Sequence, residues 1–371
     1  MFDGMEMGIF PLVARPALLD MSRSLDVVPE QFMAHWMGII TALFLLGAAL
    51  GGFVFGWLGD RIGRVKAMSA SILTYSLFSG LAFFSQVPWH LGAFRFLAAL
   101  GMGGEWSLGV ALVMEIWPEQ KRPMLAGVIG AASNVGFALV AAIGMIFPIS
   151  ISSWRWVMLV GALPALLTFV IRIFVPESEK WKEANEKREG KSILSEIFRP
   201  PLLYPTLLAI AFASIALIGT WGSVQWLPSW ADQMAGPLHP KAKAYTQELS
   251  AIGAIFGSLA GAWIGGRFGR RISFFALCFI SLGLCAYLFR QVDSYAGTFL
   301  VMVFLVGGIT ASFYGWLPLY LPELFPTRVR ATAQGLAYNS GRILAAVGAI
   351  KMGDLLGQFG GSYPKAGAII T

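Results

Sequence analysis

The chain has few charged residues for its length, and hardly any cysteine or histidine. Only 13% of its 371 residues are Asp, Glu, Lys or Arg, about half the share found in soluble proteins. The two cysteines, Cys278 and Cys285, lie in one apolar run, and there are only three histidines, which argues against a disulfide framework or a metal site. These shortages exclude a soluble enzyme, a disordered chain and a disulfide-stapled secreted protein.

Long apolar runs are abundant instead. Hydrophobic residues make up 57% of the chain, and runs of about 20 residues, enough to cross a hydrocarbon core of ~30 Å, recur throughout. Full spans are predicted near 33–56, 67–86, 90–113, 124–148, 154–175, 202–228, 247–265, 272–290, 296–320 and 330–353. Shorter stretches at 1–19 and 363–371 flank them, which predicts an all-α membrane protein of twelve spans whose first and last helices are truncated in this sequence.

The basic residues are divided unevenly between the two sides of the membrane. Most of the 27 Lys and Arg residues lie in or beside alternate loops, at 57–66, 114–123, 176–201, 266–271 and 321–329. The positive-inside rule therefore predicts that these loops and both termini of the intact protein are cytoplasmic. The net charge of +7 orients the protein in the lipid bilayer, and we expect no nucleic-acid partner.

An internal repeat divides the chain. The mixed-charge loop 176–201 separates two groups of spans, 1–175 and 202–371. The segment 59–64 recurs in degenerate form at 265–270, and the spaced pattern Glu115, Pro118, Arg122, Gly127 recurs as Glu323, Pro326, Arg330, Gly335. The repeat predicts two parallel six-helix bundles joined by a cytoplasmic linker, a transporter design in which substrate lies between the halves.

The stretch from Gly56 to Lys66, with Asp60, Arg61, Gly63 and Arg64, resembles the signature between spans two and three of the major facilitator superfamily. Its degenerate copy and the Glu–Pro–Arg segments extend the resemblance over the whole chain. The resemblance implies a major facilitator fold, two six-helix bundles related by pseudo-twofold symmetry. Segments 2–6, 95–106 and 321–328 are most similar to bacterial proton symporters for sialic acid and other carboxylates, with sugar and aromatic-acid porters as close relatives. This resemblance implies a location in a bacterial cytoplasmic (inner) membrane.

The same resemblance implies that the charged cytoplasmic turns act as a gate. Asp60 can accept hydrogen bonds at the start of the next helix, and Arg61 and Arg64 can reach an acid such as Glu115. Such pairs would latch the two halves together on the cytoplasmic side while the cavity faces outward. The expected gate residues are Gly56, Asp60, Arg61, Gly63, Arg64, Glu115, Arg122, Arg267, Arg270, Glu323 and Arg330. The alternative is that they anchor the loops at the headgroups and orient the protein.

Few ionisable residues lie inside the predicted spans, where a charge costs at least ~2.5–3.5 kcal/mol. In the sugar porters that the chain resembles, a span-one acid and a span-four arginine are thought to couple protons, and Glu6 and Arg95 fall at those positions. Asp3 and Glu105 are further candidates for proton coupling. The alternatives are that Glu6 and Arg95 form a permanent structural ion pair, and that the carboxyl group of Glu105 bonds to a partner on a neighbouring helix.

The remaining intramembrane charge is Arg342, about the middle of its span. A lone guanidinium that faces a cavity suits a carboxylate because its planar fork donates two parallel hydrogen bonds. We therefore expect Arg342 to be the counter-ion of the substrate, with a salt bridge to an acid in span one or four as the alternative. Further substrate contacts are expected from Asn339, Asn134, Gln225, Tyr314 and Trp221.

Together these patterns predict a secondary active transporter that moves a small organic anion with protons by alternating access. A proton-coupled sugar or other neutral-solute symporter, or an exporter of the same fold, is the alternative. A membrane enzyme or a sensor is disfavoured, since the sequence shows no Ser/His/Asp set, metal-ligand spacing, phosphate loop or sizeable soluble domain. No cofactor or metal is expected, and the sequence leaves the oligomeric state open.

Overall fold

The computed structural model describes the backbone of the whole chain except residues 24–28, 117–121, 175–176, 178–196 and 326. Within that part of the chain the regular secondary structure is entirely helical, as the sequence predicted. The predicted linker 176–201 falls mostly outside the described residues. So do the side chains of five predicted gate residues, Asp60, Arg61, Glu115, Arg122 and Arg330.

The helices of the first half follow the predicted spans closely. They are α1 (Phe2–Ser22), α2 (Pro29–Ile62), α3 (Arg64–Leu81), α4 (Pro88–Ile116), α5 (Arg122–Ile146), α6 (Trp154–Val160) and α7 (Ala165–Phe174), with a short 3₁₀ turn, η1 (Ala82–Phe84). Pro29 and Pro88 open α2 and α4, where the missing N–H has no intrahelical partner to lose.

The second half repeats this arrangement. Its helices are α10 (Leu203–Gly222), α11 (Leu227–Ala235), α12 (Ala242–Phe268), α13 (Arg270–Gln291), α14 (Gly297–Tyr320), α15 (Thr327–Gln358) and α16 (Tyr363–Ile370), with 3₁₀ turns η3 (Val224–Trp226), η4 (Gly236–Leu238) and η5 (Leu321–Leu324). In the described part of the chain, seven helices are long and apolar enough to cross a membrane. The chain is therefore built as a multi-pass membrane protein.

Two predicted spans are interrupted in the structure. The span expected over 154–175 is split into α6 and α7, because Pro164 has no backbone N–H to donate. The turn between the two helices is held by backbone hydrogen bonds between residues three apart, such as Gly161 N to Met158 O, 3.1 Å. The span expected over 202–228 breaks at Ser223, whose φ of −137° and ψ of −58° lie outside the helical region. The chain then continues through η3 into α11, beyond the predicted boundary.

The repeated turns have matching backbones in the two halves. Gly63, between α2 and α3, has φ of 108°, and Gly269, between α12 and α13, has φ of 82°. Glycine occupies such positive φ values without the steric cost that other residues bear. The first basic residue of each following helix, Arg64 or Arg270, therefore leaves its turn in the same way, which gives a structural reason for the repeated sequence.

Small residues let the central helices of each half approach closely. A Cβ atom placed on Gly51 of α2 would lie 1.8 Å from the carbonyl oxygen of Leu100 in α4, and one on Gly257 of α12 would lie 1.8 Å from that of Gly308 in α14. These glycines therefore let the helix backbones come into close contact. Gly56 of α2 is not part of this close packing, because a Cβ atom there meets no atom within 4 Å.

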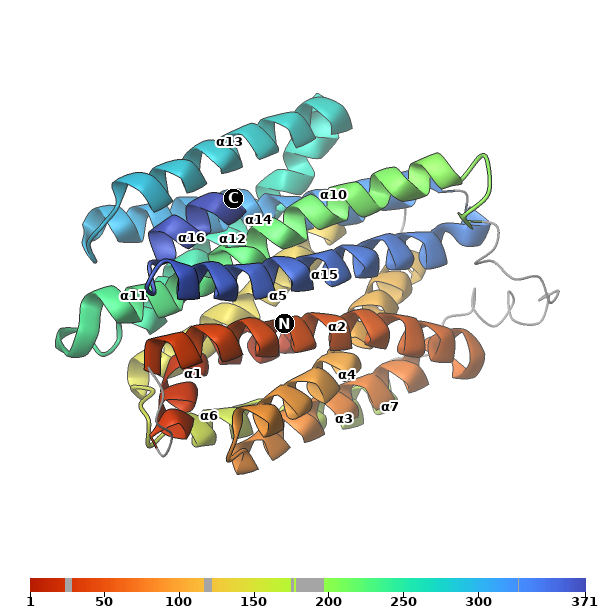
Figure 1. The fold of residues 1–371 in the computed structure, drawn as a ribbon. Helices are drawn as coiled ribbons and strands as arrows, with labels where there is room; N and C mark the ends of the chain where they lie inside the picture. The colour runs from red at the N-terminus through yellow and green to blue at the C-terminus, as the bar shows by residue number, and fades with distance from the viewer. Residues whose placement is uncertain (24–28, 117–121, 175–176, 178–196, 326) are drawn as a thin grey trace.

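The two halves meet along full-length helices. In Figure 1 the first half, coloured from red to yellow, lies against the second half, coloured from green to blue. Helix α2 packs on α15, and α5 packs on α12 and α14. Helix α1 also contacts α11 and α12 across the same boundary. This boundary encloses the cavity described next.

Candidate functional site

A cavity of about 130 Å³ lies between the two halves, which is room for several water molecules. Its wall is built from α1, α4 and α5 on one side and from α10, α12, α14 and α15 on the other. Most of the wall is apolar, as is usual for a small-molecule site. The polar lining residues are Asp3, Ser133, Asn134, Thr220, Gln225, Gln247, Ser250, Thr310, Tyr314, Tyr338 and Arg342.

Among the described residues, the wall carries one acidic and one basic side chain, and they come from opposite halves. Asp3 belongs to α1 and Arg342 to α15. Arg342 is only 6% exposed. Its Nη1 donates long hydrogen bonds of 3.4 Å to the carbonyl oxygen of Ala48 and to Oδ1 of Asn339, and its guanidinium lies 4.9 Å from the ring centroid of Tyr338.

Arg342 is not neutralised by an acid in the part of the chain whose side chains are described. Glu6 instead pairs with Arg95, and Asp3 contacts Ser133 and nearby backbone groups. A buried guanidinium without a carboxylate partner is costly, and in a cavity it offers a binding point for an anion.

The other expected substrate contacts are placed unequally. Asn134, Gln225, Tyr314 and Trp221 line the cavity, whereas Asn339 does not. Asn339 lies behind Arg342 and packs against α2, where a Cβ atom on Gly52 would meet its amide nitrogen at 2.2 Å. Asn339 is thus placed to support the arginine and is shielded from a ligand in the cavity.

Two of the lining residues have unused polar atoms. Within the described part of the chain the hydroxyl of Tyr314 is buried without a hydrogen-bond partner, and such a group is expensive to leave unpaired. Gln247, which the sequence reading missed, donates from Nε2 to the carbonyl oxygens of Gly8, 3.0 Å, and Phe137, 3.3 Å, while its Oε1 has no partner among the described residues. A polar amide inside an apolar span was the available signal for Gln247.

Glu6 and Arg95 form an ion pair behind the cavity. Nη1 of Arg95 lies 2.5 Å from Oε1 of Glu6, and the two side chains are 2% and 1% exposed. The guanidinium of Arg95 also lies 4.4 Å from the ring centroid of Phe44 and 5.2 Å from that of Phe10. Both residues belong to the first half, so a movement of α1 relative to α4 would be needed to separate them.

The other two acids in the first half have different surroundings. Asp3 lines the cavity, accepts a hydrogen bond from Ser133, 3.3 Å, and contacts the backbone amide of Gly4 and the terminal amine of Met1. Glu105 of α4 does not line the cavity, and its Oε2 has no hydrogen-bond partner within the described residues. Asp3 and Glu6 share the start of α1 but contact different helices, α5 and α4.

The charged turns at the other end of the first half contain an acid that the sequence reading did not select. The carboxylate of Glu177 accepts hydrogen bonds from the backbone amides of Arg64, 2.8 Å, and Val65, 3.2 Å, at the start of α3. An anion at a helix N-terminus satisfies unpaired N–H groups and the helix dipole. Gly63 leaves room for it, because a Cβ atom there would lie 2.3 Å from Glu177 Oε2.

The equivalent turn of the second half holds an ion pair. Arg270 donates from Nε and Nη2 to the two carboxylate oxygens of Glu323, 3.0 and 2.7 Å, and from Nη1 to the carbonyl oxygen of Gly265. Arg267 is exposed. Because Arg270 and Glu323 both belong to the second half, this pair does not join the halves, unlike the latch expected from the sequence.

Comparison with known proteins places this architecture in a family. A family model described as Major Facilitator Superfamily matches residues 5–349. The chain belongs to the Major Facilitator Superfamily. As a member it is a membrane transporter of small molecules and not an enzyme. The predicted fold and the predicted family are both confirmed.

Individual relatives give the same result. The chain is 28% identical to a cis,cis-muconate transport protein of Acinetobacter baylyi, over 96% of this chain and 88% of the relative. It is 27% identical to the sialic acid transporter NanX of Escherichia coli, over 82% of this chain and 74% of the relative. A crystal structure of a D-xylose-proton symporter superimposes with a TM-score of 0.71 at 15% identity, over 99% of this chain and 94% of that one, which supports the fold.

Proposed function

We propose that this member of the superfamily carries a small organic anion, of the carboxylate or sialate class, across the bacterial cytoplasmic membrane together with protons. The observation that carries the proposal is the buried guanidinium of Arg342, which faces the cavity and has no acidic partner among the described side chains. A carboxylate placed there would receive charge-assisted hydrogen bonds. Relatives named for muconate and sialic acid, both carboxylates, support this choice.

The cavity offers a second set of contacts for the rest of such a ligand. Asn134 and Gln225 supply amides, Tyr314 supplies an unpaired hydroxyl, and the ring of Trp221 forms part of the wall. Because these groups come from both halves, a ligand bound to them would hold the halves together around itself. Ligand contacts divided between two halves are the basis of alternating access.

Proton coupling is assigned to the acids of the first half. Glu6 is paired with Arg95, and Asp3 and Glu105 lie nearby in α1 and α4. A buried carboxylate keeps its charge while a guanidinium is beside it and takes up a proton when the partner withdraws. Helix movements that separate Glu6 from Arg95 would therefore exchange protons as the carrier changes conformation.

The orientation follows from the basic loops. We propose that the α2–α3 and α12–α13 turns are cytoplasmic, in keeping with the positive-inside rule. The opposite end, with the α1–α2 and α11–α12 connections, then faces the outside.

The test is uptake into proteoliposomes of labelled cis,cis-muconate, sialic acid and D-xylose, each with and without an inward proton gradient. We expect gradient-stimulated uptake of at least one carboxylate and none of the neutral sugar. Uptake of xylose alone would support the neutral-solute alternative, whereas carboxylate uptake that ignores the gradient would remove proton coupling. Efflux driven by an outward gradient in preference to uptake would indicate an exporter.

A further inference from the structure

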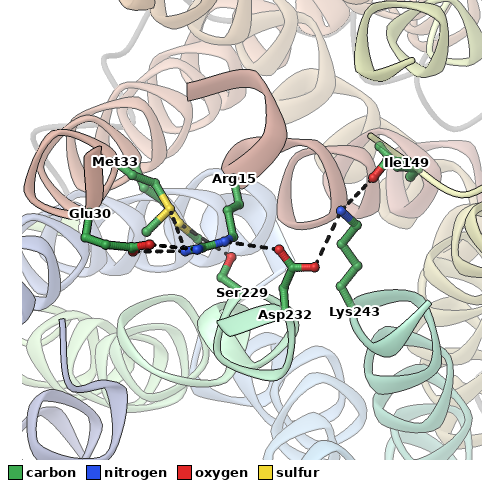
Figure 2. A network of polar contacts seen from close by, with 8 residues as sticks. Arg15, Glu30, Met33, Ile149, Ser229, Asp232 and Lys243 are labelled. Atoms are coloured by element: carbon green, nitrogen blue, oxygen red, sulfur yellow. Dashed lines mark hydrogen bonds and ion pairs between the residues drawn. The ribbon is translucent and has the colours of Figure 1, made fainter. Parts of the chain in front are cut away.

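Four charged side chains form a continuous chain of contacts (Figure 2). They lie near α11, at the end of the molecule opposite the α2–α3 turn (Figure 1). Arg15 binds both carboxylate oxygens of Glu30, 2.7 and 2.9 Å, and its Nε lies 3.1 Å from Oδ2 of Asp232. The other oxygen of Asp232 lies 3.7 Å from Nζ of Lys243. Lys243 donates in turn to the carbonyl oxygen of Ile149, 2.7 Å.

The chain of contacts crosses the boundary between the halves twice. Arg15 of α1 and Glu30 of α2 belong to the first half, whereas Asp232 of α11 and Lys243 of α12 belong to the second. The Arg15–Asp232 ion pair therefore joins the halves, as does the bond from Lys243 to the first-half carbonyl of Ile149. Each half thus contributes one cationic side chain, Arg15 or Lys243, that binds a group of the other half.

Most of these side chains are partly shielded from solvent, so their contacts can stabilise the closed state. Arg15 is 16% exposed, Asp232 22% and Lys243 7%, whereas Glu30 is 41% exposed. The contacts of Arg15 and Lys243 with Asp232 are therefore better shielded than fully exposed pairs, whose contribution is close to zero. Arg15, Asp232 and Lys243 all line an open vestibule of about 690 Å³, and none of them lines the central cavity. The ion chain therefore borders the vestibule, and the cavity-lining Gln247 follows Lys243 along α12.

A second layer of contacts closes the same path one helical turn deeper. Gln247 follows Lys243 by one turn of α12 and donates to the carbonyl oxygens of Gly8 and Phe137 in the first half. Gly8 permits this approach, because a Cβ atom there would lie 3.1 Å from the amide nitrogen of Gln247. The cavity is thus closed at this end by two layers of contacts, and each layer includes hydrogen bonds or ion pairs from one half to the other.

We propose that Arg15, Glu30, Asp232 and Lys243 form a latch that holds this end of the cavity closed and that can open without leaving any of the four charges unpaired. When the halves separate, Arg15 keeps Glu30 and Asp232 keeps Lys243, because each of those pairs lies within one half. An unpaired buried charge is the most costly product of breaking an ion pair, so this arrangement lowers the barrier to opening. The latch deepens the alternating access proposed above and rests on it.

The arrangement predicts effects of opposite sign for two similar substitutions. Asp232→Asn removes the bridge between the halves, so the open state should become more populated. Glu30→Gln removes the partner that Arg15 keeps on opening, so the closed state should become more populated. A network that merely stabilised the fold would respond in the same direction to both changes.

The test measures access to the cavity from the latch end. Ala251, which lines the cavity two turns of α12 beyond Lys243, is replaced by cysteine in a chain whose Cys278 and Cys285 are changed to alanine. A membrane-impermeant thiol reagent is applied from the vestibule side of oriented vesicles. Labelling after unfolding in detergent gives the total amount of protein. Asp354→Asn is the matched control, since Asp354 pairs with Lys351 within the single helix α15.

We expect labelling about three- to tenfold faster with Asp232→Asn, about threefold or more slower with Glu30→Gln, and unchanged with Asp354→Asn. Equal rates in the parent and Asp232→Asn, or a shift in the same direction for both latch variants, would overturn the latch. The measurement uses neither a carboxylate nor a proton gradient. Failure of the substrate or coupling assignment would therefore leave the labelling pattern intact.

Discussion

The guanidinium of Arg342 lies 4.9 Å from the ring centroid of Tyr338, and both side chains face the cavity between the halves. Cation–π contact of this kind holds an arginine in place without neutralising its charge. Asn339, three residues before Arg342 on the same helix, supports it from behind. Arg342 is therefore positioned as a fixed positive charge whose remaining donors are available to a ligand.

Replacing Arg342 with lysine keeps the charge but removes the planar fork. Hydrogen bonds to charged groups contribute about 1.5–3 kcal/mol each, so Arg342→Lys should weaken the apparent affinity for a carboxylate about 10- to 100-fold. The measurement is concentration-dependent uptake in proteoliposomes. Lys351→Gln, an exposed cation on the same helix, should leave the affinity unchanged. An unaltered affinity in Arg342→Lys would exclude this residue as the counter-ion.

The fold could be predicted from the sequence because each membrane span is a long run of apolar residues that is visible in the sequence itself. The apolar runs predicted the helices to within a few residues, and the repeated turns with Gly63 and Gly269 indicated two related halves. The breaks within the sixth and seventh spans were missed. Hydropathy does not change at a proline such as Pro164 or at Ser223, so it cannot report a local change of backbone geometry.

The site was predicted less completely because the hydrogen-bond and ion-pair partners of a side chain depend on how the helices pack, which the sequence does not show. Arg15 lies in the predicted stretch 1–19, and Asp232 and Lys243 lie between the spans predicted over 202–228 and 247–265, so nothing in the sequence indicates that the three residues meet across the halves. Asn339 was expected to contact the substrate because it lies one turn from Arg342. Only the packing of α15 against α2 shows that it is turned away from the cavity.

The second prediction concerns the pair Glu6–Arg95. Glu6→Gln should abolish accumulation of substrate against its gradient while substrate exchange across the membrane continues, because exchange needs no net proton movement. This single change leaves Arg95 buried and unpaired, at a cost of about 3–5 kcal/mol, so it will also lower thermal stability. Uptake and counterflow are measured on the same preparation.

The double variant Glu6→Gln/Arg95→Gln separates coupling from stability. With both charges removed, most of the lost stability should return, since no buried charge is left alone, whereas gradient-driven accumulation should stay absent. Normal accumulation by a stable double variant would show that the pair is structural.

The third prediction concerns the hydroxyl of Tyr314. It faces the cavity and has no hydrogen-bond partner among the described residues, so Tyr314→Phe should not reduce stability. If the hydroxyl contacts the substrate, its loss should raise the apparent KM about 2- to 10-fold, the effect of one hydrogen bond of about 0.5–1.5 kcal/mol. Tyr204→Phe, at an exposed tyrosine, is the control. Unchanged kinetics in Tyr314→Phe would remove the tyrosine from the binding site.

The last prediction compares two glycines in neighbouring helices of the second half. A Cβ atom on Gly257 would lie 1.8 Å from a carbonyl oxygen of α14, whereas one on Gly283 of α13 meets no atom within 4 Å. Gly257→Ala should therefore force α12 and α14 apart and lower stability by about 1–3 kcal/mol. Gly283→Ala should be neutral, or stabilising by up to about 1 kcal/mol through helix propensity. Thermal unfolding of the purified variants in detergent measures both. Equal melting temperatures would mean that α12 can move away from α14 at no cost, contrary to the close packing of these helices.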